Sequence, residues 1–304
     1  MSGECTVRVR FHQPSPALRR YFTTFYLTEL DVADGGRVED FIHPEWGGVR
    51  MVQGVLPEGG VLGGAVFGGI ANIGQGPTSM CIRHRSGTAR IWGFGLLPAG
   101  WARFVPTPAS TLADSVFDAQ RQPAFAAFRP MMATLFDKGS DEAAELARIE
   151  QHFLGRLDEP ALDPPSPDEP RIFAVHDALM DTDIANVHDM ADAAGMKTHT
   201  LERLSRRYFG FAPSLLLRRQ RFMRSLAQYV MDPSLKWIGA IDPHYHDQAQ
   251  FVRDFHRFMG MSPREYVAMP HPILDAVMHA RAVSAGAAVQ ALHKPGAADP
   301  VATA

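Results

Sequence analysis

Cysteine is scarce in this chain, with only Cys5 and Cys81 among 304 residues. The two residues form no Cys-x-x-Cys pair and no Cys/His spacing of a zinc module, which argues for a reducing compartment. No run of about 18 apolar residues occurs that would cross a membrane, and the segment "MSGECTVRVRFHQ" has no apolar core of a signal peptide. We therefore expect a cytoplasmic protein that does not associate with membranes.

The net charge is small, and no catalytic motif stands out. The formal charge is -3 and the pI is about 6.5, so binding of a polyanion would require a local basic patch. The glycine-rich segment 59–76 contains neither GxxxxGK[ST] nor GxGxxG between a strand and a helix, and tight turns and bulges explain it better. No Ser/His/Asp, Cys/His or paired-carboxylate constellation stands out, so we expect neither enzymatic activity nor a cofactor.

The pattern of apolar residues changes along the chain. Short apolar or alternating runs such as "CTVRVRF" and "ARIWGFGLL" predict β-strands in residues 1–105. Helical periodicity follows in 106–160, and five prolines in "DEPALDPPSPDEP" indicate a linker that includes 161–170. Residues 171–270 are helical again, and 271–304 form an Ala-rich tail whose extreme end we expect to be disordered. The predicted fold class is α+β, an antiparallel β-barrel followed by helices and an all-α domain.

The stretch "AAGMKTHTLERLSRRYFGFAP", residues 193–213, has the pattern of a helix-turn-helix corner. Asn186 can cap the preceding short helix, and Gly195 supplies a left-handed turn. The next helix, about Thr198 to Phe209, has an apolar stripe on one side and basic residues on the other. A solvated charged face would give the same pattern in one helix alone. The stripe contains Leu201, Leu204 and Tyr208, and the polar face contains His199, Glu202, Arg203, Arg206 and Arg207.

Two further observations favour a recognition helix. Between Lys197 and Arg224 there are eight basic residues against the single acidic residue Glu202, whereas a solvated helix usually mixes signs. The pattern also recurs about fifty residues later, because "TLERLSRRYFGFAP" aligns with "QFVRDFHRFMGMSP". The sequence thus predicts two related helix-turn-helix units joined by a helix, about Pro213 to Met231.

The stretches "RYFGFAPSLLLRRQRF" and "YHDQAQFVRDFHRFMGMSPREY" resemble the DNA-binding domain of AraC/XylS-type transcriptional regulators over roughly residues 170–268. The resemblance implies two recognition helices in successive major-groove segments of double-stranded DNA, and RNA polymerase as a partner if the protein is an activator. Carried over position by position, the base-reading residues are His199, Glu202, Arg203, Gln248, Ala249 and Arg253. The expected phosphate contacts are Lys197, Arg206, Arg207, His246 and Arg257.

Three positions depart from the family pattern. Lys197 replaces the usual Ser and cannot cap the first recognition helix. In the second unit, His244 stands where the family has the turn glycine, and Pro243 precedes it, which predicts a strained turn and either a shortened first helix or altered docking. Asp247 can still cap the second recognition helix.

The amino-terminal third resembles, more weakly, the cupin-like sensor domains that precede this module in many family members. The resemblance implies a small organic effector or a role in dimerisation. A metal-binding cupin normally has two close histidines and a Glu, whereas only His43 stands beside Glu45, with His84 farther on, so a surface His beside a turn is favoured and no metal is expected. Most aromatic residues here are expected in the core; the pocket prediction is His43, Trp46, Arg50 and Trp92.

The leading hypothesis is a sequence-specific transcription regulator, more often an activator in this family, that is controlled by an effector in the front domain. Control by a protein partner, and a cupin-like enzyme with an appended DNA-binding module, are the alternatives. An apolar stripe in 106–160 must pack on the barrel or on a second copy, and a homodimer is favoured. That stripe is Leu146, Ile149, Phe153 and Leu157.

Overall fold

The computed structural model describes residues 5–137, 139–158 and 166–296. Ten strands, all paired antiparallel among these residues, form two sheets in the front domain. The larger sheet has the order β1-β2-β9-β4-β7-β10 and the smaller sheet has the order β3-β8-β5-β6. The strands are β1 (Cys5–His12), β2 (Phe22–Val32), β3 (Val38–Ile42), β4 (Gly48–Gly54), β5 (Glu58–Val61), β6 (Val66–Gly68), β7 (Asn72–Gln75), β8 (Ile82–Ser86), β9 (Ala89–Leu96) and β10 (Val116–Asp118).

The predicted fold class is confirmed, with one difference in the front domain. No hydrogen-bonded strand pair joins the two sheets within the described residues, so the strands form a cupin-like sandwich and not a closed barrel. Strand β8 alternates buried and exposed side chains, as a strand with one face on the core must. In the glycine-rich segment, Gly63 and Gly69 have φ of 74° and 68°, so they form turns of the left-handed kind.

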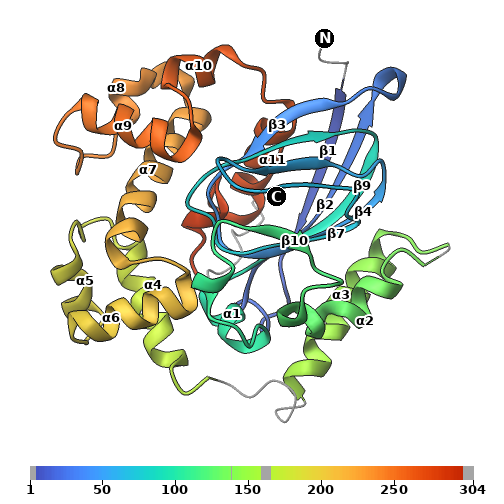
Figure 1. The fold of residues 1–304 in the computed structure, drawn as a ribbon, viewed down its shortest axis with the longest axis horizontal. Coiled ribbons are helices and arrows are strands. Elements are labelled where there is room, and N and C mark those ends of the chain that lie inside the picture. Colours follow the sequence, from blue (N-terminus) through green and yellow to red (C-terminus); the bar gives the residue numbers. More distant parts are fainter. Residues whose placement is uncertain (1–4, 138, 159–165, 297–304) are drawn as a thin grey trace, which may run out of the picture.

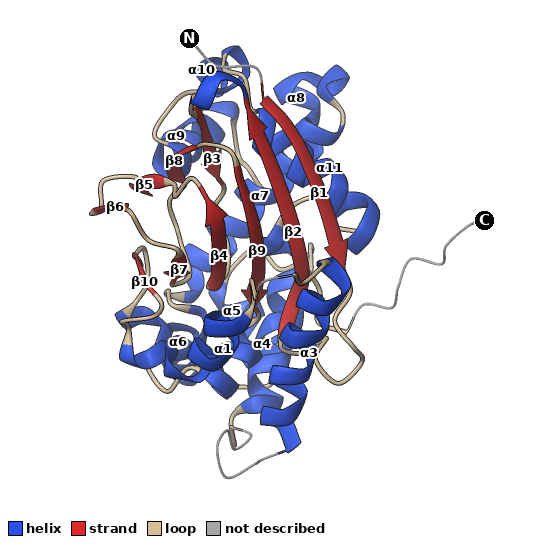
Figure 2. Cartoon of the chain, turned by 90° about the vertical axis from the view of Figure 1, so that its right-hand side faces the viewer, coloured by secondary structure: helices blue, strands red, loops and turns tan. Residues whose placement is uncertain are grey.

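Helices α1 (Pro98–Phe104), α2 (Arg129–Thr134) and α3 (Glu142–Asp158) cover one end of the larger sheet (Figure 2). On α3, Ile149 and Phe153 are fully buried. The ring of Phe153 lies 4.4 Å from that of Phe22 on β2 and 5.3 Å from that of Phe94 on β9. The stripe predicted in the sequence therefore packs on the chain's own sheet, and its buried part is not free for a second copy.

The second helical region lies beside the sandwich (Figure 1). Helix α7 spans Pro213 to Met231, as the sequence predicted, and separates the first group of helices from the second. Residues 161–165 of the predicted linker lie outside the described residues. The helices are α4 (Glu169–Met180), α5 (Val187–Ala193), α6 (Thr198–Leu204), α7 (Pro213–Met231), α8 (Lys236–Ala240), α9 (Gln248–Met259) and α10 (Pro263–Ala268).

The Ala-rich segment after residue 271 returns to the front domain. Helix α11 (Pro272–Ala285) lies beside β1, and a 3₁₀ turn (Gln290–Leu292) follows (Figure 2). The backbone N–H groups of Ile273 and Leu274 donate to the buried carboxylate of Asp40 on β3, at 2.8 and 2.9 Å. Part of the expected tail is therefore a packed helix, because Asp40 satisfies the free amides of its first turn.

Candidate nucleic-acid interface and internal cavity

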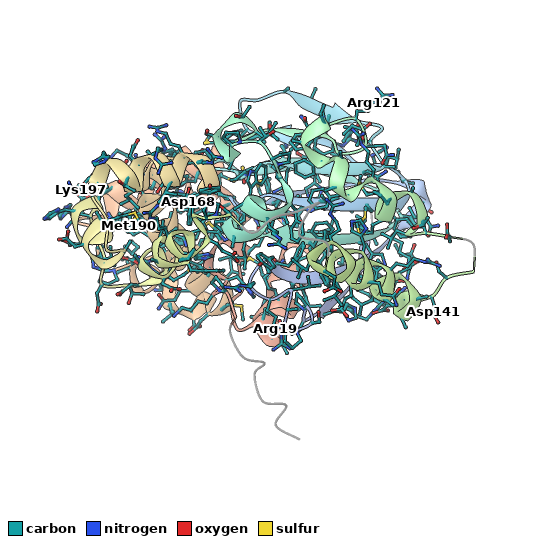
Figure 3. The ribbon with its side chains drawn as sticks, turned by 90° about the horizontal axis from the view of Figure 1, so that it is seen from below. Arg19, Arg121, Asp141, Asp168, Met190 and Lys197 are labelled. Atoms are coloured by element: carbon teal, nitrogen blue, oxygen red, sulfur yellow. The ribbon has the colours of Figure 1, made fainter. Side chains whose placement is uncertain are left out.

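The first helix-turn-helix unit is built by α5 and α6. The side chain of Asn186 accepts hydrogen bonds from the backbone N–H groups of His188 and Asp189, both at 3.0 Å, and Gly195 has φ of 63°, so both sequence predictions are confirmed. Lys197 makes no side-chain cap of α6, as expected. Figure 3 shows Lys197 at the outer edge of this domain.

Helix α6 continues as a π-helix over Ser205–Phe209 and ends at Gly210, whose φ is 87°. The widened turn lies at the end of the predicted recognition helix, where Tyr208 is buried and its hydroxyl donates to Asp168 at 3.1 Å. The outward face is exposed at His199, Arg203, Arg206 and Arg207, while Glu202 is half-buried.

Glu202 and Arg206 form an ion pair on this face, with 2.8 Å between Arg206 Nη2 and Glu202 Oε1. The pair joins a predicted base-reading residue to a predicted phosphate contact, at the i, i+4 spacing at which helical side chains meet. Arg203 forms no ion pair in the described part of the chain and stays exposed. The guanidinium of Arg203 is therefore exposed and outside the ion pair that holds Arg206.

In the second unit, the side chain of Asp247 caps α9 by accepting from the backbone N–H of Gln250 at 2.6 Å, as predicted. The first helix of this unit, α8, is short, in agreement with the departure noted at Pro243. The strain expected at His244 was wrong, because His244 does not have a positive φ: the non-glycine residues with positive φ in the described ranges are Asp34, Asp114 and Lys236. The exposed predicted contacts are Gln248, Ala249, Arg253, His246 and Arg257.

The basic residues between Lys197 and Arg224 contribute less positive charge to the surface than the sequence suggests. Arg218 pairs with Asp254 on α9, and Arg224 pairs with Asp242, at 2.6 Å between Nε and Oδ2. Arg219 is fully buried. These arginines of α7 hold the two units and the front domain together, so the free positive charge of the first unit is carried by residues of α6 and its ends.

A cavity of about 130 Å³ lies between the two sheets and α11. His43 and Arg50, which the sequence singled out, line the cavity, whereas Trp46 and Trp92 do not. Trp46 lies at the boundary with α7, where the Arg219 guanidinium is 4.2 Å from its ring centroid. Trp92 lies under α3 and donates from Nε1 to Glu145 at 2.6 Å. The structure thus brings together only two of the four predicted pocket residues.

Several polar side chains of the cavity are held by hydrogen bonds. Glu45 accepts from Arg50 and from Gln75, whose Nε2 is 2.8 Å from Glu45 Oε1. His43 Nε2 lies 3.1 Å from the hydroxyl of Tyr266 on α10, and burial lowers the pKa of His43 to about 3. His84 bonds to Ser86 at 2.9 Å, and burial lowers its pKa to about 4. Both histidines are therefore neutral at pH 7.

The wall that α11 and the 3₁₀ turn supply was not predicted from the sequence. Arg281 and Gln290 line the cavity from this segment, and the apolar residues Ile273, Leu274 and Met278 complete the wall. The signal available in the sequence was a lone arginine, Arg281, within the Ala-rich segment, and nothing in the sequence shows that it is buried. Within the described ranges, no group of three or more His, Cys, Asp and Glu side chains is arranged to hold a metal ion.

One comparison with known proteins matches the helical region. Residues 190–269 match the family model described as a helix-turn-helix domain. No curated protein matches the chain significantly. A structure of ToxT from Vibrio cholerae is similar at 8% identity and a TM-score of 0.43, covering 87% of this chain and 98% of that one. A structure of ToxT with a bound unsaturated fatty acid is similar at 8% identity and a TM-score of 0.41, covering 88% of this chain and 97% of that one.

The AraC-like transcriptional activator CuxR is similar at 13% identity and a TM-score of 0.28, covering 73% of this chain and 87% of that one. At such scores these likenesses say nothing about what this chain binds. Among the described helices, none combines the length and the apolar character that crossing a bilayer requires.

Proposed function

We propose that this chain, a DNA-binding transcription regulator with an AraC-type helix-turn-helix domain at its carboxyl end, is controlled by a small organic effector that occupies the cavity beside α11. One observation carries the proposal. The cavity wall is shared between the front domain and residues 273–290, which directly follow the second helix-turn-helix unit. A ligand in the cavity therefore contacts both parts of the molecule.

Direct bonds between the front domain and the second unit supply a route for the control. The Cys81 backbone N–H donates to the carbonyl of Phe258 at the end of α9, at 2.8 Å, and His43 in the cavity wall bonds to Tyr266. A ligand that displaces His43 or α11 changes these bonds. Such a ligand shifts the balance between two arrangements of the domains by its difference in affinity for them.

The DNA contacts of the proposal are those that the sequence assigned, and the cationic ones among them are the strongest candidates. Arg203 and Arg253 lie exposed on α6 and α9, where they are available to base edges, and Lys197, Arg207, His246 and Arg257 are available to phosphates. The protein would act in the cytoplasm on double-stranded DNA and, as an activator, would contact RNA polymerase.

The apolar cavity supports control by an effector over control by a protein partner, because a front domain filled with polar side chains and without a cavity would favour the latter. The enzyme alternative has less support, since Glu45, Arg50 and Gln75 bond to one another, His84 bonds to Ser86, and these groups are not arranged around a reactive centre.

The proposal is tested with the full chain on the DNA site obtained by footprinting the region that flanks its gene. Asp40→Asn removes the charge that holds the first turn of α11, so α11 should loosen and affinity for the site should change at least threefold. Asp31→Asn, an exposed change on β2, is the matched control and should leave affinity unchanged. If hydrogen exchange shows α11 loosened while DNA affinity equals that of the wild type, α11 does not couple the cavity to the DNA-binding domain.

A further inference from the structure

Arg281 on α11 is a buried cation without a carboxylate partner. Its side chain is 4% exposed, and Nη1 donates to the hydroxyl of Thr24 at 3.1 Å. The guanidinium lies 4.7 Å from the ring centroid of Phe11 and 5.9 Å from that of Tyr26. No Asp or Glu of the described ranges lies within ion-pair distance of it. Buried charges in proteins are normally paired, and because Arg281 lines the cavity, an anion bound there can pair with it.

The other charged groups of the cavity leave that anion to be supplied from outside. Glu45 is the acidic residue of the wall, and it already accepts from Arg50 and Gln75. His43 and His84 are neutral because burial lowers the pKa of each. One carboxylate thus faces two guanidinium groups, and the cavity carries a net positive charge.

The rest of the wall sets the kind of anion. It is formed mainly by aliphatic and aromatic side chains, among them Leu30, Phe41, Ile73, Ile82 and Ile91. The volume of about 130 Å³ is close to that of an apolar cavity that holds a benzene ring. A phosphate or a sugar would leave many polar groups against this wall without partners, whereas a compact hydrocarbon group suits it.

We propose, on the basis of the effector control proposed above, that the cavity binds a small apolar monocarboxylate whose carboxylate pairs with Arg281. The planar guanidinium matches a carboxylate in a two-bond arrangement, which is stronger than a neutral hydrogen bond. Because Arg281 belongs to α11, the acid would fasten this helix to the front domain. The charge of the ligand would then determine how tightly α11, which follows the second helix-turn-helix unit in sequence, is held to the front domain.

The test uses the full chain with two carboxylates, hexanoate and cyclohexanecarboxylate, and their uncharged amides, hexanamide and cyclohexanecarboxamide. Calorimetric titration of the wild type should show at least tenfold tighter binding of each acid than of its amide. Arg281→Gln should abolish that preference while amide binding persists, and Arg281→Lys should retain part of it. The control is Arg8→Gln, a change of an exposed arginine on the neighbouring strand β1, which should leave the preference intact.

Equal binding of acid and amide by the wild type, or a preference that survives Arg281→Gln, would overturn the role of Arg281 while leaving an effector cavity in place. Binding of none of the four compounds would overturn the assignment to small monocarboxylates. The Asp40→Asn measurement of DNA affinity does not depend on the ligand, so failure of the proposed control is seen separately. If Arg281→Gln does not fold, Thr24→Val, which removes the present partner of the guanidinium, should strengthen acid binding, and unchanged binding would count against the proposal.

Discussion

The guanidinium of Arg219 lies 4.2 Å from the ring centroid of Trp46, and both side chains are fully buried between α7 and the front domain. Arg219 also donates from Nη1 to the carbonyl of Thr78 at 2.9 Å. Burial lowers the pKa of Arg219 to about 9, so the side chain is still a cation at pH 7. A residue of the DNA-binding domain is thus fixed by the aromatic face and backbone of the front domain.

Removing this cation should loosen the contact between the domains. Arg219→Met keeps much of the volume but loses the interaction with Trp46, and Trp46→Leu should lose the same interaction. A double-mutant cycle on the unfolding free energy should therefore give a coupling of about 1 to 2 kcal/mol. Arg207→Met, on the exposed face of the same domain, is the control. Additive effects of the two buried changes would show that the contact does not join the domains energetically.

Arg203 and Arg206 should fail differently in DNA binding. Arg203→Ala should weaken the true site by about 1 to 3 kcal/mol and flatten preference at one base position. Arg206→Ala should weaken all sequences alike and reduce the salt slope by about one unit. Titrations of each variant against the true site and a scrambled duplex at several salt concentrations distinguish the two effects. If Arg203→Ala lowers the affinity for both duplexes equally, α6 contributes only a basic surface and Arg203 does not read a base.

The Glu202–Arg206 ion pair adds a third variant to that series. Glu202→Gln removes a negative charge from the exposed face of α6 and should raise affinity for scrambled duplex, since the carboxylate no longer repels phosphate or competes with it for Arg206. Lower affinity for the true site alone would instead identify Glu202 as a base-reading residue, as the sequence implied.

Ile149→Glu should unfold the front domain and not merely separate two copies. The side chain is fully buried in the core beneath α3, and an unpaired carboxylate there should cost about 3 kcal/mol or more of unfolding free energy. Thermal melts by circular dichroism, run with light scattering, measure both properties. The control is Gln151→Glu, an exposed change on the same helix. A stable, folded monomer obtained from a dimeric wild type would restore the dimer interpretation of this stripe.

His176 should contribute to loss of stability in acid. Burial lowers its pKa to about 3, with His293 and Arg219 nearby, whereas histidine in the unfolded chain has a pKa near 6.5. Between pH 6.5 and about 3 the unfolded chain binds the proton and the folded chain does not, so unfolding free energy falls by up to about 1.4 kcal/mol per pH unit from this residue. His176→Phe should make the acid limb of urea-unfolding data shallower, and His188→Gln, an exposed change, should not. Parallel limbs for His176→Phe and wild type would contradict the assignment.

Local features of the helix-turn-helix domain followed from the sequence. The cap at Asn186, the turn at Gly195, the extent of α7 and the cap at Asp247 depend on hydrogen bonds and steric limits within a few residues, and all were predicted. The strand-rich front domain was recognisable for the same reason, because alternation along a strand is a local pattern. The strain expected at His244 is absent, because the left-handed non-glycine residue near this turn is Lys236 at the start of α8 and not His244.

Tertiary structure alone decided the cavity and the fate of the arginines. Thr24 and Arg281 are 257 residues apart in the chain, and Arg219 is 174 residues from Glu45, whose carbonyl accepts from it at 3.4 Å. An arginine can be exposed to DNA, buried at an interface or line a cavity. Which of these applies depends on the aromatic rings and carboxylates, far away in sequence, that surround it after folding. By itself the sequence determined that this is a DNA-binding chain with two recognition helices. The packing of α7 and α11 on the front domain decided which of its cationic side chains remain exposed to solvent.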